Sequence, residues 1–282
     1  MGADRPLVTV ITTCFNHEPY LDDYCRGLLA QTYEHVELVI FDDGSADDSW
    51  QKISDYIPAL ERKFTRVVAE RHEHIGGPAE VLLAVGRAQG ELMCFLDSDD
   101  YYLPEKLEEN VRFMRSNPDA VAVHSDTDII HRDGIERSHW RRKRTIPTGD
   151  VYVELLAGNF VMPCAFCCRT DLFRRYVPFE DYARHGYLAG DYARSLDLAR
   201  HGPFGYIDRS LARYRVVEGS ESNPRTREEQ LRFLRSMYAM RLDYLDDPRV
   251  TPELAEQVER DYYWIRYQQG VELGRLADCE EG

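Results

Sequence analysis

The stretch CFLDSDDYYLP, residues 94–104, begins as an apolar run and ends in three carboxylates within four positions, Asp97, Asp99 and Asp100. Neighbouring carboxylates repel one another and are costly to remove from water, so such a cluster is either a solvated turn or a site that holds a cation. The residues ELMCFLD (91–97) have the length and composition of a buried strand. This stretch therefore predicts a strand that delivers its carboxylates into a turn.

Other segments of the chain have the same apolar, β-branched character. They are LVTVITT (7–13), VELVIFD (36–42), TRVVAER (65–71) and AVAVHSD (120–126). Between them, EPYLDDYCRGLLAQT (18–32) and GPAEVLLAVGRAQG (77–90) have the spacing of amphipathic helices. This alternation predicts an α/β fold with an open, mostly parallel sheet and helices on both of its faces.

In such sheets, ligands bind at the carboxyl ends of the strands. The first predicted strand ends in Thr13-Cys14-Phe15-Asn16, the second in Asp42-Asp43-Gly44-Ser45, and the fourth in the acidic stretch 97–100. We therefore expect three polar clusters to face one crevice.

The bulk composition excludes several classes of function. The 282 residues include 50 acidic and 35 basic ones, a net charge of −15, which disfavours general binding to nucleic acid or to an anionic membrane. The N-terminus has no signal-peptide pattern and no segment approaches the roughly 20 apolar residues of a membrane span, so we expect a soluble, cytoplasmic protein. Seven scattered cysteines lack the spacing of a zinc site, which favours reduced, packed thiols.

The pattern is looser after residue 126. YVELLAGN (152–159), TDLFRRY (170–176) and GDYARSLDLARHG (190–202) read as short helices, and GYIDRSLARYRV (205–216) reads as strands. Two amphipathic helices are expected at 225–246 and 252–277, the second with Thr251 as its cap and Pro252 at its first position.

The chain lacks the glycine patterns that cradle phosphates directly. A diphosphate would then be held through Mg²⁺ or Mn²⁺ on an Asp-x-Asp motif, here Asp97-Ser98-Asp99. Taken alone, this motif is explained equally well by a solvated turn or by a helix cap before Pro104. Its position after an apolar strand, beside a second acidic strand end, favours the cation site.

Five segments in this order resemble the family 2 inverting glycosyltransferases with the GT-A fold. They are VTVITTCFN, QTYEHVELVIFDDGSADDS, AQGELMCFLDSDDYYLP, GDYARSLDLARHG and ARYRVVEGSES, between about residues 7 and 222. The resemblance implies a nucleotide-diphospho-sugar donor, a divalent metal and a saccharide, lipid-linked or small-molecule acceptor. It also implies a nucleotide-sugar-binding half at 1–115, an acceptor-binding and catalytic half at 116–222, and a C-terminal helical extension at 223–282.

The resemblance also implies roles for single residues. Thr13 and Phe15 match the strand end that contacts the base, Asp43 the acceptor of a base N–H, Asp97 the carboxylate near ribose or metal, Asp99 the metal ligand and Asp191 the catalytic base. The mechanism implied is a single displacement, in which Asp191 deprotonates the acceptor hydroxyl while the metal on Asp99 stabilises the departing diphosphate.

Three positions depart from the family pattern. Val81 stands where an arginine near the donor is usual, Val217 where a histidine is usual, and Gly190 where a glutamate precedes the aspartate. Arg71, His72 or His74 could replace the arginine, and Glu218 or a water the histidine. These departures keep open a catalytically degenerate sugar-nucleotide-binding or scaffold protein. A nucleotidyltransferase is disfavoured because TTCFNHEPY is neither glycine-rich nor basic.

Several of these residues also have purely structural interpretations. Asp43 can cap its turn, Thr13 and Phe15 can pack at a strand end, and Asp191 can cap its helix. We expect His72, His74 and His124 to be exposed strand residues rather than ligands.

Two further groups of side chains have open interpretations. The basic run of Arg137 and 141–144 is either a solvated loop or, through Arg141–Arg144, a contact with an anionic acceptor or membrane surface. Four C-terminal aromatics are expected to pack, with a homodimer contact or an acceptor platform as the alternative: Tyr262, Tyr263, Trp264 and Tyr267.

Overall fold

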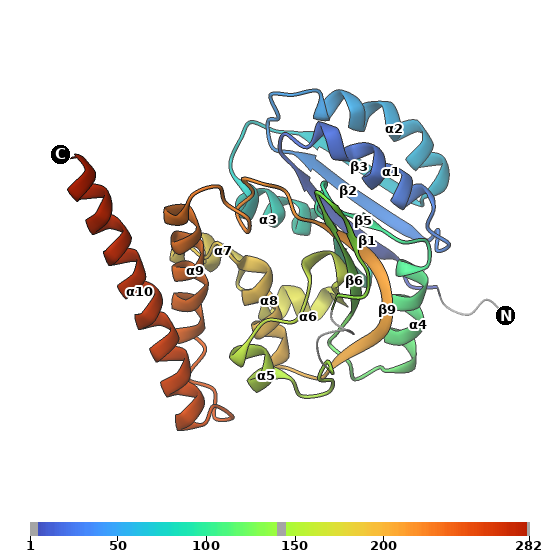
Figure 1. The fold of residues 1–282 in the computed structure, drawn as a ribbon. Coiled ribbons are helices and arrows are strands. Elements are labelled where there is room, and N and C mark those ends of the chain that lie inside the picture. The colour runs from blue at the N-terminus through green and yellow to red at the C-terminus, as the bar shows by residue number, and fades with distance from the viewer. Residues whose placement is uncertain (1–4, 140–144, 281–282) are drawn as a thin grey trace.

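The computed structural model of the protein describes residues 5–139 and 145–280 (Figure 1). Within these residues nine strands form one sheet in the order β3-β2-β1-β4-β8-β6-β9-β5, and β7 pairs with β6. The strands are β1 (Val8–Cys14), β2 (Val36–Asp42), β3 (Arg66–Arg71), β4 (Leu92–Phe95), β5 (Tyr101–Tyr102), β6 (Ala122–His131), β7 (Gly134–Glu136), β8 (Cys167–Arg169) and β9 (Phe204–Arg215).

The sheet is mostly parallel, as the alternation of strands and helices predicts. Strands β3, β2, β1 and β4 are parallel, and so are β6 and β9. The short strand β8 lies antiparallel between β4 and β6, and β5 lies antiparallel beside β9. Both short strands escape prediction because two or three residues carry no readable periodicity.

Helices cover both faces of the sheet (Figure 1). They are α1 (Leu21–Leu29), α2 (Ser49–Lys63), α3 (Gly77–Arg87), α4 (Lys106–Ser116), α5 (Tyr152–Ala157), α6 (Thr170–Tyr176), α7 (Phe179–His185), α8 (Gly190–Ala199), α9 (Arg227–Leu242) and α10 (Pro252–Glu280), with 3₁₀ turns at Glu18–Tyr20 and Pro163–Ala165. Helices α1, α2 and α4 share one apolar core with the sheet, and α3 and α5 to α10 share the other.

Alternation along β1 explains how one strand serves both cores. Val8 and Val10 belong to the core under α1 and α2, whereas Ile11 belongs to the core under α3 and α8. All seven residues of β2 are buried, which is typical of a parallel strand covered on both faces.

The C-terminal extension is a pair of packed helices. Thr226 and Glu229 form a reciprocal capping box at the start of α9, and the Thr251 hydroxyl accepts a hydrogen bond from the Leu254 N–H at the start of α10. Leu254, Val258 and Ile265 are buried, as their spacing predicts.

The aromatic side chains of α10 correct one expectation. Tyr263, Trp264 and Tyr267 are 57–64% exposed rather than packed, and Trp264 and Tyr267 line a surface hollow together with Arg227 of α9.

Two expectations about the whole chain can also be compared with the structure. The six cysteines whose side chains the structure describes are free and buried, as expected. Among residues 5–139 and 145–280, no helix combines the length and the apolar composition of a membrane span.

The candidate active-site cleft

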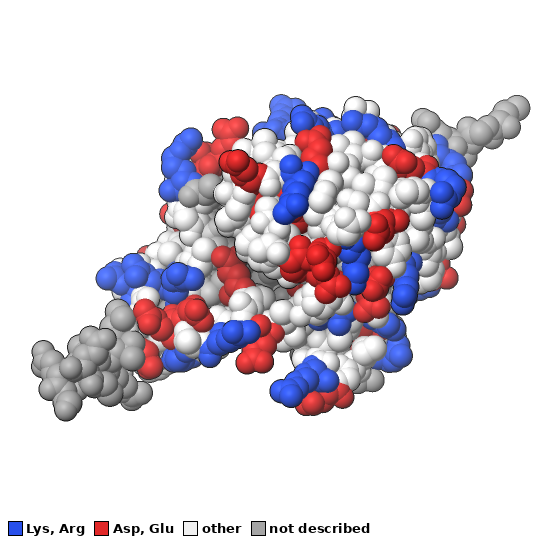
Figure 2. Space-filling view, turned by 90° about the horizontal axis from the view of Figure 1, so that it is seen from above, with Lys and Arg blue, Asp and Glu red and all other residues white. Residues whose placement is uncertain are grey.

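One cleft of about 630 Å³ opens at the carboxyl ends of β1, β2 and β4. Its walls include all six residues whose roles the family resemblance implies: Thr13, Phe15, Asp43, Asp97, Asp99 and Asp191. Figure 2 shows acidic side chains beside the hollow in the middle of this face. The three polar clusters expected from the sequence thus meet at one place, while their individual roles stay predictions.

The first wall of the cleft is a pair of interlocked turns after β1 and β2. Asn16 adopts a left-handed conformation (φ 55°), its N–H donates to the Ser45 hydroxyl at 2.9 Å, and its side chain accepts from the Ala46 N–H at 2.8 Å. Gly44 (φ +74°) has no room for a side chain, since an added Cβ would lie 2.8 Å from the backbone nitrogen of His74.

Asp43 is held by the loop that follows β3. Its carboxylate accepts hydrogen bonds from the Ile75 and Gly76 N–H groups at 2.7 and 3.0 Å, and His74 Nδ1 lies 2.9 Å from it. The turn itself is capped by Asp42, whose carboxylate accepts from the Ser45 N–H at 3.1 Å. Turn capping therefore explains Asp42 and not Asp43.

Phe15 and His74 form an exposed aromatic surface at this end. Their rings stack with centroids 4.3 Å apart, and Phe15 is 42% exposed. Strand-end packing therefore does not account for Phe15. His74 lies in the loop after β3 and lines the cleft, which corrects its expected place in an exposed strand.

The other proposed substitutes for the missing arginine face elsewhere. Arg71 donates to the Ser45 carbonyl and pairs with Asp42, and His72 contacts Glu70 and Glu80. Val81 packs against the core under α3.

The acidic turn after β4 divides its three carboxylates between two environments. Asp97 and Asp99 line the cleft, whereas Asp100 is buried and accepts from the Arg215 N–H at 2.7 Å. The Arg215 guanidinium also donates to the Asp99 carbonyl at 2.9 Å and pairs with Asp23. The turn is thereby fixed to the end of β9.

The carboxyl groups of Asp97 and Asp99 lie in an enclosed environment. Asp97 is accessible from the cleft, but the surrounding walls reduce its hydration. This loss of hydration, together with the nearby charges of Asp99 and Asp191, raises the pKa of Asp97 to about 6. Burial also raises the pKa of Asp99 to about 6, against the opposing influence of Arg215. Arg194 and, to a smaller extent, His17 oppose the rise in the pKa of Asp97.

Asp191 stands in the first turn of α8, on the far side of the acidic turn. Ala189, not Asp191, is the N-cap residue, and no side-chain cap bond forms there. The helix-cap interpretation of Asp191 is therefore wrong. Its partly exposed carboxylate instead shares the cleft with Asp97 and Asp99.

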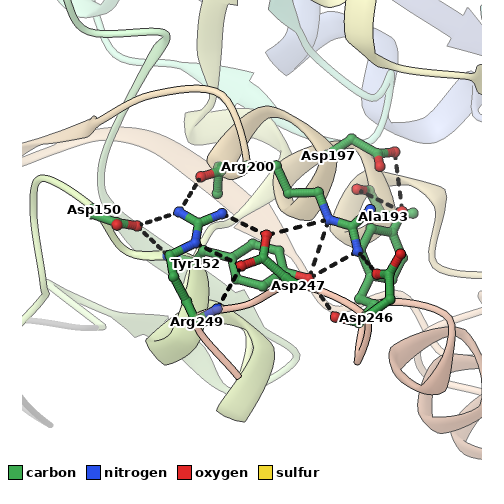
Figure 3. Close-up of polar contacts among 10 residues, drawn as sticks. Asp150, Tyr152, Ala193, Asp197, Arg200, Asp246, Asp247 and Arg249 are labelled. Atoms are coloured by element: carbon green, nitrogen blue, oxygen red, sulfur yellow. Dashed lines mark hydrogen bonds and ion pairs between the residues drawn. The ribbon is translucent and has the colours of Figure 1, made fainter. Parts of the chain in front are cut away.

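Helix α8 is anchored at its other end by a polar network (Figure 3). Asp197 accepts from the Tyr182 and Tyr244 hydroxyls, and its pKa rises to about 6 because it is buried, although both donors oppose that rise. Arg200 contacts the Tyr152 hydroxyl and pairs with Asp246.

The same network continues into the linker between α9 and α10. Arg249 pairs with Asp150 and with Asp247, each at 2.8 Å, and its guanidinium lies 4.5 Å from the centre of the Tyr152 ring. The C-terminal extension therefore fixes the helix that carries Asp191.

Several lining residues have no counterpart in the sequence expectations. His17 Nδ1 and the Ser98 hydroxyl share a hydrogen bond of 2.8 Å, and burial lowers the pKa of His17. Glu221 lies near Asp191 in the cleft wall. Burial, and to a smaller extent the charge of Asp191, raises the pKa of Glu221. Glu218, suggested as a substitute for the missing histidine, is not among the lining residues. Glu221 of the GSES sequence at 219–222 lines the cleft instead.

Two other expectations concern residues outside the cleft. His124 is fully buried rather than exposed, and desolvation lowers its pKa to about 3. Arg137 lies 3.6 Å from the Asp128 carboxylate, and the predicted contact through Arg141–Arg144 falls outside the described residues.

Comparison with known proteins places this architecture in a family. The model of glycosyl transferase family 2 matches residues 9–176, more than half of the chain. The protein therefore belongs to glycosyl transferase family 2, and it is a glycosyltransferase, as the motifs predict.

Two relatives illustrate the family likeness in sequence. The chain is 28% identical over 220 residues to a Bacillus subtilis protein provisionally assigned as the teichuronic acid biosynthesis glycosyltransferase TuaG, covering 78% of this chain and 82% of that one. It is 31% identical over 187 residues to the Escherichia coli UDP-Glc:alpha-D-GlcNAc-diphosphoundecaprenol beta-1,3-glucosyltransferase WfaP, covering 63% and 68%.

Solved structures share the fold. S. aureus TarS 1-349 in complex with UDP superposes with a TM-score of 0.62 at 19% identity, over 91% of this chain and 70% of that one. The mannosyltransferase PcManGT from Pyrobaculum calidifontis, in complex with GDP-Man and Mn²⁺, gives 0.65 at 17% identity, over 98% and 76%. The GT-A fold expected from the sequence is confirmed.

Proposed function

We propose that the protein transfers a sugar from a nucleotide-diphosphate donor to an acceptor hydroxyl with inversion at the anomeric carbon. The observation that carries the proposal is the meeting of Asp43, the Asp97 and Asp99 pair, and Asp191 in one cleft. One relative named for UDP-Glc transfer, and structures solved with UDP or GDP-Man, support a nucleotide-sugar donor.

The donor would lie along the strand ends. Phe15 and His74 offer an aromatic surface for the nucleobase, and Thr13 lines the cleft as well. The Asp43 carboxylate, which also lines the cleft, is held by two backbone N–H groups. We assign 1–115 to donor binding, 116–222 to acceptor binding and catalysis, and 223–282 to a supporting extension.

Asp97 and Asp99 fit a Mg²⁺ or Mn²⁺ ion. Both offer carboxylate oxygens, which these ions prefer, and both line the same cleft from one turn, two positions apart in the sequence. No group of three or more ligating side chains occurs within the described residues, so donor phosphate and water would complete the shell. When bound, the ion would supply charge neutralisation for the departing diphosphate.

Asp191 is proposed as the base. Its carboxylate lies in the cleft beyond the acidic turn, where it can accept the proton of an acceptor hydroxyl as that oxygen attacks the sugar from the face opposite the leaving group. The acceptor is proposed to be a saccharide, either lipid-linked or part of a surface polysaccharide.

Calorimetry with UDP, GDP and dTDP, with and without Mn²⁺, tests the donor proposal. We expect Mn²⁺-dependent binding of at least one nucleotide, and its loss in Asp99→Ala. Absence of binding of all three with metal present would reject the enzyme, and binding without transfer or donor hydrolysis would favour a sugar-nucleotide-binding scaffold.

A homodimer through the C-terminal helices is a further part of the proposal. The exposed Tyr263, Trp264 and Tyr267 support it, because aromatic side chains are enriched at interfaces. Sedimentation of the protein and of Trp264→Ser tests it, and an unchanged monomer for both would reject it.

A further inference from the structure

A second cavity of about 760 Å³ lies beside the cleft, between α9 and the loop that leads into α8. Leu188 lines both the cleft and this second cavity, so the two are adjacent. We call the second cavity the α9 groove. Neither the family motifs nor the proposed donor site uses it.

The two hollows lie along adjacent stripes of α9. Phe233 and Met237 line the cleft, whereas Arg232, Ser236 and Ala239 line the α9 groove. Residues three and four apart share a face of a helix, which explains why each stripe serves one hollow. The two hollows therefore meet at Leu188, which a ligand reaching from the cleft into the groove would have to pass.

The loop wall of the groove is fastened to α9. The Ser236 hydroxyl accepts from the Leu188 N–H and donates to the Gly186 carbonyl, both at 3.0 Å, and the Tyr187 hydroxyl binds Asp243. The groove is therefore a built feature. Its wall continues directly into Ala189 and Asp191.

The groove combines cations with apolar surface. Arg232 and Arg235 line it and are exposed, and neither forms an ion pair with a carboxylate within the described residues. Arg235 is bonded to the amide of Gln269, and Arg232 acts at longer range on Glu221. The one acidic side chain in the described lining, Asp243, is bonded to Tyr187.

Apolar surface accompanies these two arginines. Leu188, Ala239, Leu242 and Tyr262 contribute it. Two arginines can bind phosphate oxygens through several hydrogen bonds each, and the apolar side chains favour hydrocarbon over water.

We propose that the α9 groove binds the diphosphate and first isoprenoid units of a lipid-linked acceptor whose sugar lies beside Asp191. The charge of Arg232 and Arg235 suits a diphosphate, and the apolar surface beside them suits a hydrocarbon chain. The proposal rests on the glycosyltransferase function above and narrows its acceptor to a sugar carried on an isoprenoid diphosphate.

Farnesyl diphosphate is a suitable probe because it carries the diphosphate and three isoprene units without a sugar. Binding to the full chain is measured by calorimetry in the presence and absence of UDP and Mn²⁺. We expect farnesyl diphosphate to bind without displacing UDP, and inorganic pyrophosphate and farnesol each to bind at least about tenfold more weakly.

Arginine variants locate the site. The double variant Arg232→Gln with Arg235→Gln should weaken farnesyl diphosphate binding at least about tenfold and leave UDP binding unchanged. Arg232→Gln alone tests the site without disturbing the Arg235 contact to α10. Arg227→Gln is the matched control, because Arg227 lies on the same helix but contacts Gln268 outside the groove.

Three results would overturn the proposal: displacement of farnesyl diphosphate by UDP, equal binding of farnesyl diphosphate by the double variant, or, with the cleft saturated by UDP and Mn²⁺, equal binding of pyrophosphate and farnesyl diphosphate. Failure of UDP to bind the unaltered protein would instead reject the donor function, so the two failures are distinguishable.

Discussion

The two ends of the cleft are held by different kinds of interaction. At the proposed donor end, Asp43 is positioned by N–H groups of the loop after the neighbouring strand β3. At the proposed acceptor end, Asp191 stands on α8, which is held by side chains from α5, α7 and the linker after α9. One end is built by strand ends and the other by long-range packing.

This difference separates the effects that substitutions should have. Changes at the strand ends should alter donor affinity, and changes around α8 should alter transfer or stability while donor affinity stays the same. Each prediction below tests that separation.

The largest effect is expected for Asp191→Asn. Removal of a general base lowers the rate by about 10² to 10⁴. Nucleotide affinity should stay within about twofold, because Asp191 is not needed to hold the nucleobase or the diphosphate. Steady-state transfer rates and UDP calorimetry measure the two quantities.

Glu221→Gln is the matched comparison for this experiment, since Glu221 shares the cleft near Asp191. A larger loss of rate in Glu221→Gln than in Asp191→Asn would move the base to Glu221.

The second effect concerns the pH dependence of stability. Asp197 has a pKa of about 6 in the folded protein against 3.8 ordinarily, so the folded state favours the protonated form. That contribution is fully present below pH 3.8 and is lost as pH rises through 6, a change on the order of 2–3 kcal/mol.

Asp197→Asn should therefore gain stability relative to the unaltered protein as pH rises from 4.5 to 7. Urea unfolding at several pH values measures this, and taking the difference between the two proteins cancels the other titrating groups. Parallel stability profiles would show that Asp197 ionises as freely in the folded state as in the unfolded one.

The donor end was the part most readable from the sequence. Thr13 lies at the end of β1, and Asp43, Asp97 and Asp99 lie in the turns after β2 and β4. Because parallel strands bring their carboxyl ends to one edge, the strand pattern alone places these residues together. The longer strands, the α8 segment and the two C-terminal helices could also be predicted, because their length and spacing give a clear pattern.

The acceptor end was readable only in part. Phe233 and Met237 reach the cleft through the packing of α9 against the loop before α8, and Glu221 reaches it from the segment between β9 and α9. No local pattern encodes these contacts. His124 illustrates the same limit, since its burial depends on neighbours from distant segments, such as Phe160 and Tyr206.

The third effect belongs to the donor end. In Asp43→Asn, an amide NH₂ group would replace one of the two carboxylate oxygens that accept from the Ile75 and Gly76 N–H groups. Loss of one such hydrogen bond costs about 1–2 kcal/mol. We expect roughly tenfold weaker UDP binding and a nearly unchanged rate at saturating donor.

Pyrophosphate with Mn²⁺ supplies the control for Asp43→Asn, because it lacks the base and ribose. Equal weakening of pyrophosphate and UDP would show that Asp43 supports the acidic turn rather than the nucleoside end.

The smallest effect is expected for Ser236→Ala, which removes the hydroxyl that fastens the loop before α8 to α9. Two hydrogen bonds at 3.0 Å are lost, to Leu188 and Gly186, at a cost of about 1 kcal/mol in the free energy of unfolding. Because this loop leads into Asp191, the transfer rate should fall a few-fold while UDP affinity is unchanged.

Ser54→Ala is the matched control in the proposed donor half, since the Ser54 hydroxyl donates to the Trp50 carbonyl within α2. Its removal should change stability by less than about 0.5 kcal/mol and leave transfer intact. If Ser236→Ala weakened UDP binding as much as transfer, the two ends of the cleft would be coupled through α9. The separation between strand ends and long-range packing would then fail at the contact where it is most directly testable.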